Sequence, residues 1–261
     1  KEIYNGDGIT GKEPTVDGIS QGMITITSTT EVLKQVNYRN SDRFYKLASQ
    51  RLMAFVDTSS PEGMKTLFKG YVVLNGEKYI VSPENCCGYS DKNWGSNFTS
   101  PWVWLSSNNL TSNLTGKKLE DSVFDIGGGC PKVFFVPLKR KLLSAFWYEG
   151  KPYEYNFSKF WTHTKTKFSF REEFQEVIWN VEQSNRKSVM VTEIHCNKKD
   201  MLFVNYEAPD GKKRHNTLWN GGNGWGNIKL YKKNRKAEGG RELIDDIDVK
   251  NVGCEYGEYD Q

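Results

Sequence analysis

The chain has 261 residues, more than one small β-domain needs, and a formal charge of +4 from 36 basic and 32 acidic side chains. Such a weak, evenly spread charge argues against a nucleic-acid groove. The sequence contains no run of about 18 apolar residues, so we expect no integral membrane segment. Aromatic residues make up 13% of the chain and glycine is frequent, whereas long segments rich in alanine, leucine and glutamate are missing. We therefore expect a mostly β protein, built as two packed halves or as one large barrel.

The cysteines form an odd-numbered set without C-x-x-C spacing: Cys86, Cys87, Cys130, Cys196 and Cys254. We interpret them as reduced thiols of a cytoplasmic protein. The first residues lack the apolar middle of a signal peptide, although a leader removed from the natural precursor would leave the same sequence. The three histidines are scattered along the chain, so we expect neither a metal nor a cofactor.

Two local patterns in the first half predict strands. Residues 22–32, GMITITSTTEV, alternate in polarity as a half-buried strand does. Residues 69–81, KGYVVLNGEKYIV, predict a hairpin in which Asn75 and Gly76 supply the tight type I′ turn. Residues 41–55 favour neither helix nor strand.

The second half is a succession of short strands separated by turns, expected at residues 132–138, 141–148, 152–157, 161–170, 176–182, 188–195, 201–207 and 227–233. Such spacing favours an antiparallel meander that closes on itself, because closure removes exposed edges. The glycine-rich residues 221–227, GGNGWGN, precede no helical pattern, so they predict a wide turn or bulge instead of a phosphate loop. We expect an all-β fold of lipocalin-like (calycin-type) antiparallel barrels or sandwiches, with an amino-terminal half at residues 1–110 and a barrel at 111–261.

The most aromatic stretch is YSDKNWGSNFTSPWVWLSSNN, residues 89–109. Within it, Trp102 and Trp104 alternate with Val103 and Leu105, so a strand would place both indoles on one side. If that side faces a cavity, it offers broad apolar walls and N–H groups that orient a ligand. The same spacing is expected if the indoles simply fill the core.

This stretch resembles the signature of the tocopherol cyclase family: an acidic residue, Lys, Asn or Asp, Trp-Gly, a Phe soon after, and a W-x-W-like strand that ends in a polar Asn. Here Asp91, Lys92, Asn93 and Trp94 begin the motif and Asn108 ends it. Further similar segments are GYVVLNGEKYIVSPENCCGYSDKNWG, DIGGGCPKVFFVPL and NYEAPDGKKRHNTLWNGG with the later CEYGEY. The resemblance covers roughly residue 50 to the end of the chain.

The resemblance implies two lipocalin-like β-domains with a pocket between or within them, as in the related carotenoid hydratase-like and Diels–Alderase-like proteins. Family members usually carry a longer first half, with a strand containing Gly-Trp-Tyr or Gly-Tyr-Tyr that is not found before Ser41. Either the first barrel is trimmed here or part of the natural chain is absent from this sequence. A second departure is Thr99-Ser100-Pro101, where the family commonly has Pro soon after Phe.

The chemistry that the resemblance implies is protonation of an alkene in a prenyl tail, after which a phenol oxygen closes on the cation. It needs a carboxylic acid that stays protonated and aromatic faces that stabilise positive charge. We assign the catalytic role to Asp91. The side chains expected to bind the ligand are Lys92, Asn93, Trp94, Trp102, Trp104 and Asn108.

Competing interpretations stay open at this point. Asp91 has an equally good structural role, pairing with Lys92 or capping a turn. The protein is then an enzyme acting on an apolar prenylated or polyene ligand by cyclisation or hydration, a non-catalytic lipid or pigment carrier, or a carbohydrate-binding β module. The sequence names neither the ligand nor the oligomeric state, and peripheral contact with a membrane is compatible with it.

Overall fold

The computed structural model describes residues 19–28, 54–56, 66–74, 77–82, 84, 87–88, 92–94, 101–130, 132–133, 136–137, 141–157, 159–207 and 214–257. The chain forms two compact units, one from residues 1–35 and 57–91 and the other from residues 36–56 and 92–261. The described residues form strands and three single-turn 3-10 helices, with no α-helix among them. The expected all-β class is thereby confirmed. No helix in the described ranges is long and apolar enough to cross a membrane.

The first unit contains a four-stranded antiparallel sheet. Its strands are β1 (Ile19–Ser28), β3 (Thr66–Leu74), β4 (Glu77–Val81) and β5 (Cys87–Gly88), in the order β1-β3-β4 with β5 also paired to β3. Leu74 pairs with Glu77 across β3 and β4, so only Asn75 and Gly76 join the two strands. The predicted hairpin is confirmed, while the geometry of its two turn residues lies outside the described residues.

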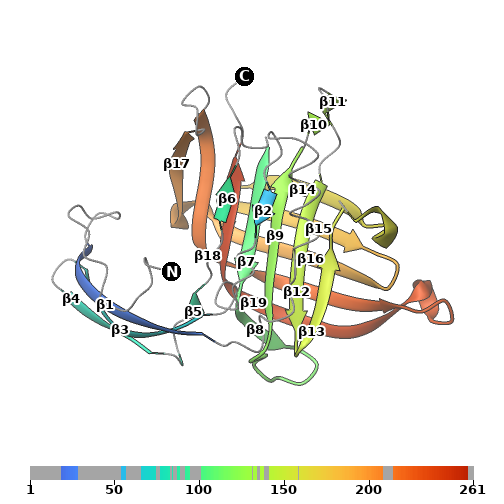
Figure 1. Cartoon of the computed structure of the whole chain (residues 1–261), viewed down its shortest axis with the longest axis horizontal. Coiled ribbons are helices and arrows are strands. Elements are labelled where there is room, and N and C mark those ends of the chain that lie inside the picture. The colour runs from blue at the N-terminus through green and yellow to red at the C-terminus, as the bar shows by residue number, and fades with distance from the viewer. Residues whose placement is uncertain are drawn as a thin grey trace. The chain divides into compact units, whose positions relative to one another are not determined.

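The second unit is built on an 11-stranded antiparallel sheet that curls into a half-barrel (Figure 1). In chain order its strands are β7 (Trp102–Ser107), β8 (Asn109–Ser112), β9 (Val123–Gly129), β12 (Lys141–Tyr148), β13 (Lys151–Tyr155), β14 (Lys165–Glu173), β15 (Glu176–Ser184), β16 (Ser188–Asn197), β17 (Met201–Glu207), β18 (Arg214–Lys233) and β19 (Arg241–Gly257). Their order in the sheet is β13-β12-β9-β7-β19-β18-β16-β15-β14, with β8 added to β19 and β17 to β18. This curled antiparallel sheet is consistent with the lipocalin-like fold that the sequence predicts, although its end strands β13 and β14 do not pair to close it as expected.

Smaller elements complete the described chain. They are the strand pair β2 (Ala54–Val56) and β6 (Lys92–Trp94), the pair β10 (Lys132–Val133) and β11 (Val136–Pro137), and the 3-10 helices η2 (Phe160–Thr162), η3 (Lys198–Asp200) and η4 (Glu238–Gly240).

The inner face of the curled sheet carries the hydrophobic core of the second unit. Strand alternation sends one set of side chains inward, including the fully buried Leu105, Phe124, Trp179 and Ile247. Strands far apart in the sheet meet across this interior: Phe170 of β14 stacks on Tyr256 of β19, with ring centroids 3.6 Å apart. Packing across the curl therefore fixes the curvature of the sheet.

Several strands differ from the predicted ones. Residues 132–138 contain two short strands, with Val133 paired to Val136, instead of one long strand. Residues 160–162 form η2, so β14 begins only at Lys165. Residues 221–227 lie within β18 as an irregular stretch with register shifts on both sides of Gly224, which confirms the predicted bulge. The strand at residues 102–107, which we assigned to the amino-terminal half, pairs in the middle of the second unit's sheet.

Candidate site on the indole face

The two indoles predicted to share a side do so on β7, which lies between β9 and β19 in the sheet (Figure 1). Val103 and Leu105 of this strand are fully buried in the core. Trp102 and Trp104 alternate with them and lie on the opposite face of the sheet. We call this surface of β7, β9, β12 and β19 the indole face.

Trp102 is fixed by a carboxylate from the far end of the chain. Its indole Nε1–H donates to Glu255 Oε2 of β19 at 2.9 Å, and the Asn220 side-chain amide donates to Glu255 Oε1 at 2.5 Å. Trp102 is only 5% exposed and Glu255 only 8%. Hydrogen bonds to an ionised acceptor are stronger than neutral ones, so this triad holds the carboxylate and the ring in one geometry.

Trp104 is held in a similar way by a carboxylate of β9, the neighbour of β7 on the side away from β19. Its Nε1–H donates to Asp125 Oδ1 of β9 at 2.9 Å, and both residues are half-buried. The ring also lies against Gly253: a Cβ placed there would be 2.6 Å from the Trp104 Cη2 atom. Glycine at position 253 therefore lets the indole lie directly on the backbone of β19.

Register explains how each pair forms. Trp104 is directly opposite Glu255 on β19 and Gly127 on β9. Each indole reaches the carboxylate two positions away from its direct partner, a diagonal within range of a long aromatic side chain. The indole face continues onto β12, where the next side chains in register are largely buried: Leu143, Ala145 and Trp147. Aromatic surface and two positioned carboxylates thus lie together on one side of the sheet.

The other predicted site residues are placed less completely. Asp91 lies outside the described residues. Lys92, Asn93 and Trp94 form β6, paired with residues 54–56 of β2. Asn108 is half-buried in the bend between β7 and β8. The structure brings Trp102 and Trp104 together, whereas it does not show these other residues beside them.

Asp125, Glu255 and Asn220 were not predicted as site residues, although each lies in a segment that carries the family resemblance. A further signal was an acidic residue within the otherwise apolar or glycine-rich strand segments VFDIGGG and GCEYG. Sequence spacing carried no further hint, because Trp102 and Glu255 are 153 positions apart.

Among the residues that the structure describes, no group of three or more His, Cys, Asp or Glu side chains is arranged so that it could hold a metal ion. His195 contacts two carboxylates, with Nδ1 at 3.2 Å from Glu176 Oε2 and Nε2 at 3.0 Å from Glu193 Oε1. The two carboxylates and the imidazole form a hydrogen-bonded group at the surface of the neighbouring strands β15 and β16.

Comparison with known proteins gives no relative: no protein-family model matches the chain, and neither a curated protein nor a solved structure matches it.

Proposed function

We propose that the protein binds an apolar, unsaturated small molecule, such as a prenylated or polyene compound, against the indole face. The observation that carries this proposal is the pair of indoles whose N–H groups are each held by a carboxylate, Trp102 by Glu255 and Trp104 by Asp125. With the N–H edges fixed, both rings keep one orientation in a rigid apolar wall, in which Trp102 is almost wholly buried and Trp104 half-buried, so a ligand would contact mainly Trp104. A preorganised wall binds a flat hydrophobic molecule with little loss of side-chain freedom.

The chemistry of such a wall extends to catalysis of the tocopherol cyclase-like type. Proton transfer to an alkene creates a cation, and the indole faces stabilise positive charge. A phenol oxygen, or water in a hydration, then adds to the cation and releases a proton to a carboxylate. Asp91 stays the proposed proton donor, while Asp125 and Glu255 are the carboxylates beside the rings in the described structure.

Binding is tested by titrating the protein with retinol, an apolar polyene alcohol, and following quenching of tryptophan fluorescence. We expect saturable binding with one retinol per chain. A Trp104→Phe variant, which loses the bond to Asp125, should bind at least five times more weakly. Trp161→Phe is the matched control, because Trp161 lies in η2 and is 52% exposed.

Two outcomes would overturn the binding proposal. Equal weakening by both tryptophan variants would show that retinol binds away from the indole face. A fluorescence response to cellulose oligosaccharides without a response to retinol would favour the carbohydrate-binding module.

Catalysis needs a separate experiment, since a carrier binds the same molecules without turnover. The protein is incubated in D₂O with a hydroquinone that carries a prenyl tail, and products are analysed by mass spectrometry. An enzyme adds one deuterium to the former alkene as the ring closes, and Asp91→Asn abolishes this product. Asp121→Asn, an exposed carboxylate in the turn before β9, serves as the control. Binding without any deuterated product would contradict the catalytic proposal and favour a non-catalytic carrier.

A further inference from the structure

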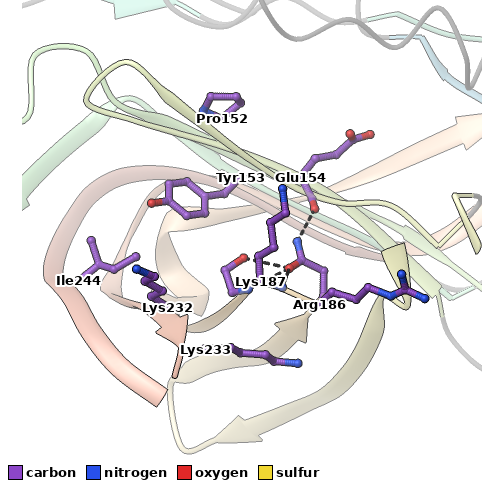
Figure 2. A pocket seen from close by; sticks show the side chains of 10 residues that line it. Pro152, Tyr153, Glu154, Arg186, Lys187, Lys232, Lys233 and Ile244 are labelled. Carbon is purple, nitrogen blue, oxygen red and sulfur yellow. Dashed lines mark hydrogen bonds between the residues drawn. The ribbon is translucent and has the colours of Figure 1, made fainter. Parts of the chain in front are cut away.

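A second site lies in the same unit at one end of the curled sheet. A pocket of about 480 Å³ opens between β13, the turn that joins β15 to β16, and the end of the β18–β19 hairpin (Figure 2). We call it the barrel-end pocket. The lining residues that matter to its chemistry are Tyr153, Glu154, Lys187, Lys232, Lys233 and Ile244. Pockets of roughly 300 to 1,000 Å³ are the usual size for small-molecule ligands.

Backbone hydrogen bonds hold the lysines at the pocket in place. Asn185 Oδ1 accepts from the backbone N–H groups of Lys187 at 2.8 Å and Ser188 at 2.9 Å, which fixes the turn between β15 and β16. The backbone N–H of Lys233 donates to Lys187 O at 2.8 Å, so the turn is also tied to the end of β18. The backbone that carries Lys187, Lys232 and Lys233 is thereby held in one frame, and the three side chains are exposed.

The charge of the barrel-end pocket is strongly positive. Four basic residues line it: Arg186, Lys187, Lys232 and Lys233. The acidic residue that lines it, Glu154, forms a salt bridge with Lys159, in which Nζ lies 2.7 Å from Oε2. In Figure 2 the Glu154 carboxylate and the Arg186 guanidinium extend away from the group formed by Tyr153, Lys187 and Lys232. Lys233 also extends away from this group, so Lys187 and Lys232 are the charges most available to a ligand.

One side of the pocket is apolar. Tyr153 and Ile244 are half-buried and pack against the core, with the Tyr153 ring 6.3 Å from that of Phe146. Figure 2 shows both side chains beside Lys232. A ligand that satisfied this pocket would place an apolar group on Tyr153 and Ile244 and a negative group among the lysines.

We propose that the barrel-end pocket binds a small organic anion, in which a carboxylate, sulfonate or phosphate is attached to an apolar body. The site is independent of the indole face, because Tyr153 packs on the inner side of the sheet and the two indoles lie on the outer side. Lysine charges provide attraction that weakens with salt, and the aromatic and aliphatic side chains provide the remaining contact.

The test uses two fluorescent probes on the whole chain. Anilinonaphthalene sulfonate is an aromatic anion, and phenyl naphthylamine has the same aromatic skeleton without the sulfonate. We expect the sulfonate to bind at least ten times more tightly than the neutral probe, and to weaken as salt is added. The double variant Lys187→Gln and Lys232→Gln should lose at least tenfold in affinity for the sulfonate and leave the affinity for the neutral probe unchanged.

A matched control separates this pocket from general surface charge. The double variant Lys117→Gln and Lys118→Gln removes the same charge from an exposed turn between β8 and β9, and should bind the sulfonate as the unmodified chain does. Equal binding of the two probes, equal loss in both double variants, or no binding of the sulfonate would each overturn the proposal. Retinol binding at the indole face should be unaffected by either lysine variant, so the two proposals fail separately.

Discussion

The side-chain amide of Gln183 on β15 donates to the carbonyl oxygen of Leu142 on β12 at 2.9 Å, although the two strands are not neighbours in the sheet. Strand β13 pairs with β12 only from Ser144 to Tyr148, so it does not reach the Leu142 carbonyl. Ser144 Oγ donates to Gln183 Oε1 at the same place. One buried amide therefore joins the two sides of the curled sheet where strand pairing stops.

Replacing Gln183 with Met should destabilise the second unit. The Leu142 carbonyl and the Ser144 hydroxyl would lose a buried partner while a side chain of similar length kept the packing. The expected loss in the free energy of unfolding is about 2 to 6 kcal/mol, from roughly 1 to 3 kcal/mol for each of the two unsatisfied groups. Urea unfolding followed by tryptophan fluorescence measures it.

The control is Gln175→Met, because Gln175 is exposed in the turn between β14 and β15. A surface change of this kind should stay within about 0.5 kcal/mol of the unmodified chain. Similar stability of the two variants would show that Gln183 does not hold the curl.

Part of this fold follows from local sequence alone. The hairpin of β3 and β4 and the strands β12, β13, β15, β16 and β17 were predicted because alternation and turn residues act over a few positions. Strand β19 was not predicted, since its acidic residues and glycines have low strand propensity. Hydrogen bonds from distant segments stabilise β19: the side-chain amides of Asn227 and Asn113 both donate to Asp246, at 2.5 and 3.0 Å. Burial raises the pKa of Asp246, but these hydrogen bonds outweigh it and the net pKa is lowered.

The candidate site was also only partly predictable from local sequence. Alternation in the printed sequence placed Trp102 and Trp104 on one side of a strand. Their partners Asp125 and Glu255 depend on which strands lie beside β7, and that order is a property of the whole sheet. No short-range sequence pattern specifies this strand order.

Gly253 connects the stability of the fold with the proposed binding surface. An alanine there would place its Cβ 2.6 and 2.7 Å from two atoms of the Trp104 ring, so the indole must move. We expect Gly253→Ala to cost about 1 to 3 kcal/mol, as overpacking does. Retinol binding should weaken along with it, because the ring leaves its bond to Asp125.

Gly222→Ala is the matched control for this substitution. It lies on β18, and its Cβ would have no other atom within 4 Å. Unfolding curves and near-ultraviolet circular dichroism compare the two variants. Equal spectra and equal stability would show that the contact between Trp104 and position 253 is unimportant.

The thiols of Cys196 and Cys254 should be protected from alkylation in the folded protein. Both are fully buried, and each sulfur would lie within 3.2 Å of a Cβ placed at Gly221. A hydrogen bond from Cys254 lowers the pKa of Cys196 and burial opposes it, but alkylation also needs access to the sulfur. Cys130, which is half-buried, should react at least ten times faster with iodoacetamide.

Peptide mass spectrometry after timed labelling measures the three rates, and urea should make them similar. Labelling of Cys196 as fast as Cys130 in the folded chain would contradict the buried position of the thiol pair.

Tyr148 should make the stability of the second unit depend on pH in the alkaline range. Its hydroxyl donates to Asp245 Oδ2 at 3.0 Å, and Ser112 Oγ donates to the other oxygen of this buried carboxylate at 2.8 Å. Burial, followed by the hydrogen bond and the charge of Asp245, raises the pKa of Tyr148 from 10 to about 12. The folded state therefore holds the phenol proton more tightly than the unfolded state. Its contribution is complete below pH 10 and is lost as the pH rises from 10 towards 12.

A Tyr148→Phe variant isolates this effect, because burial also raises the pKa of Tyr155 and that group is present in both chains. We expect the variant to be less stable than the unmodified chain below pH 10, since Asp245 loses a hydrogen bond. Between pH 10 and 12 the difference should shrink, as the unmodified chain gives up the contribution that the variant never had. Urea unfolding at a series of pH values measures both free energies. A difference that stayed constant across this range would mean that Tyr148 ionises alike in the folded and unfolded states.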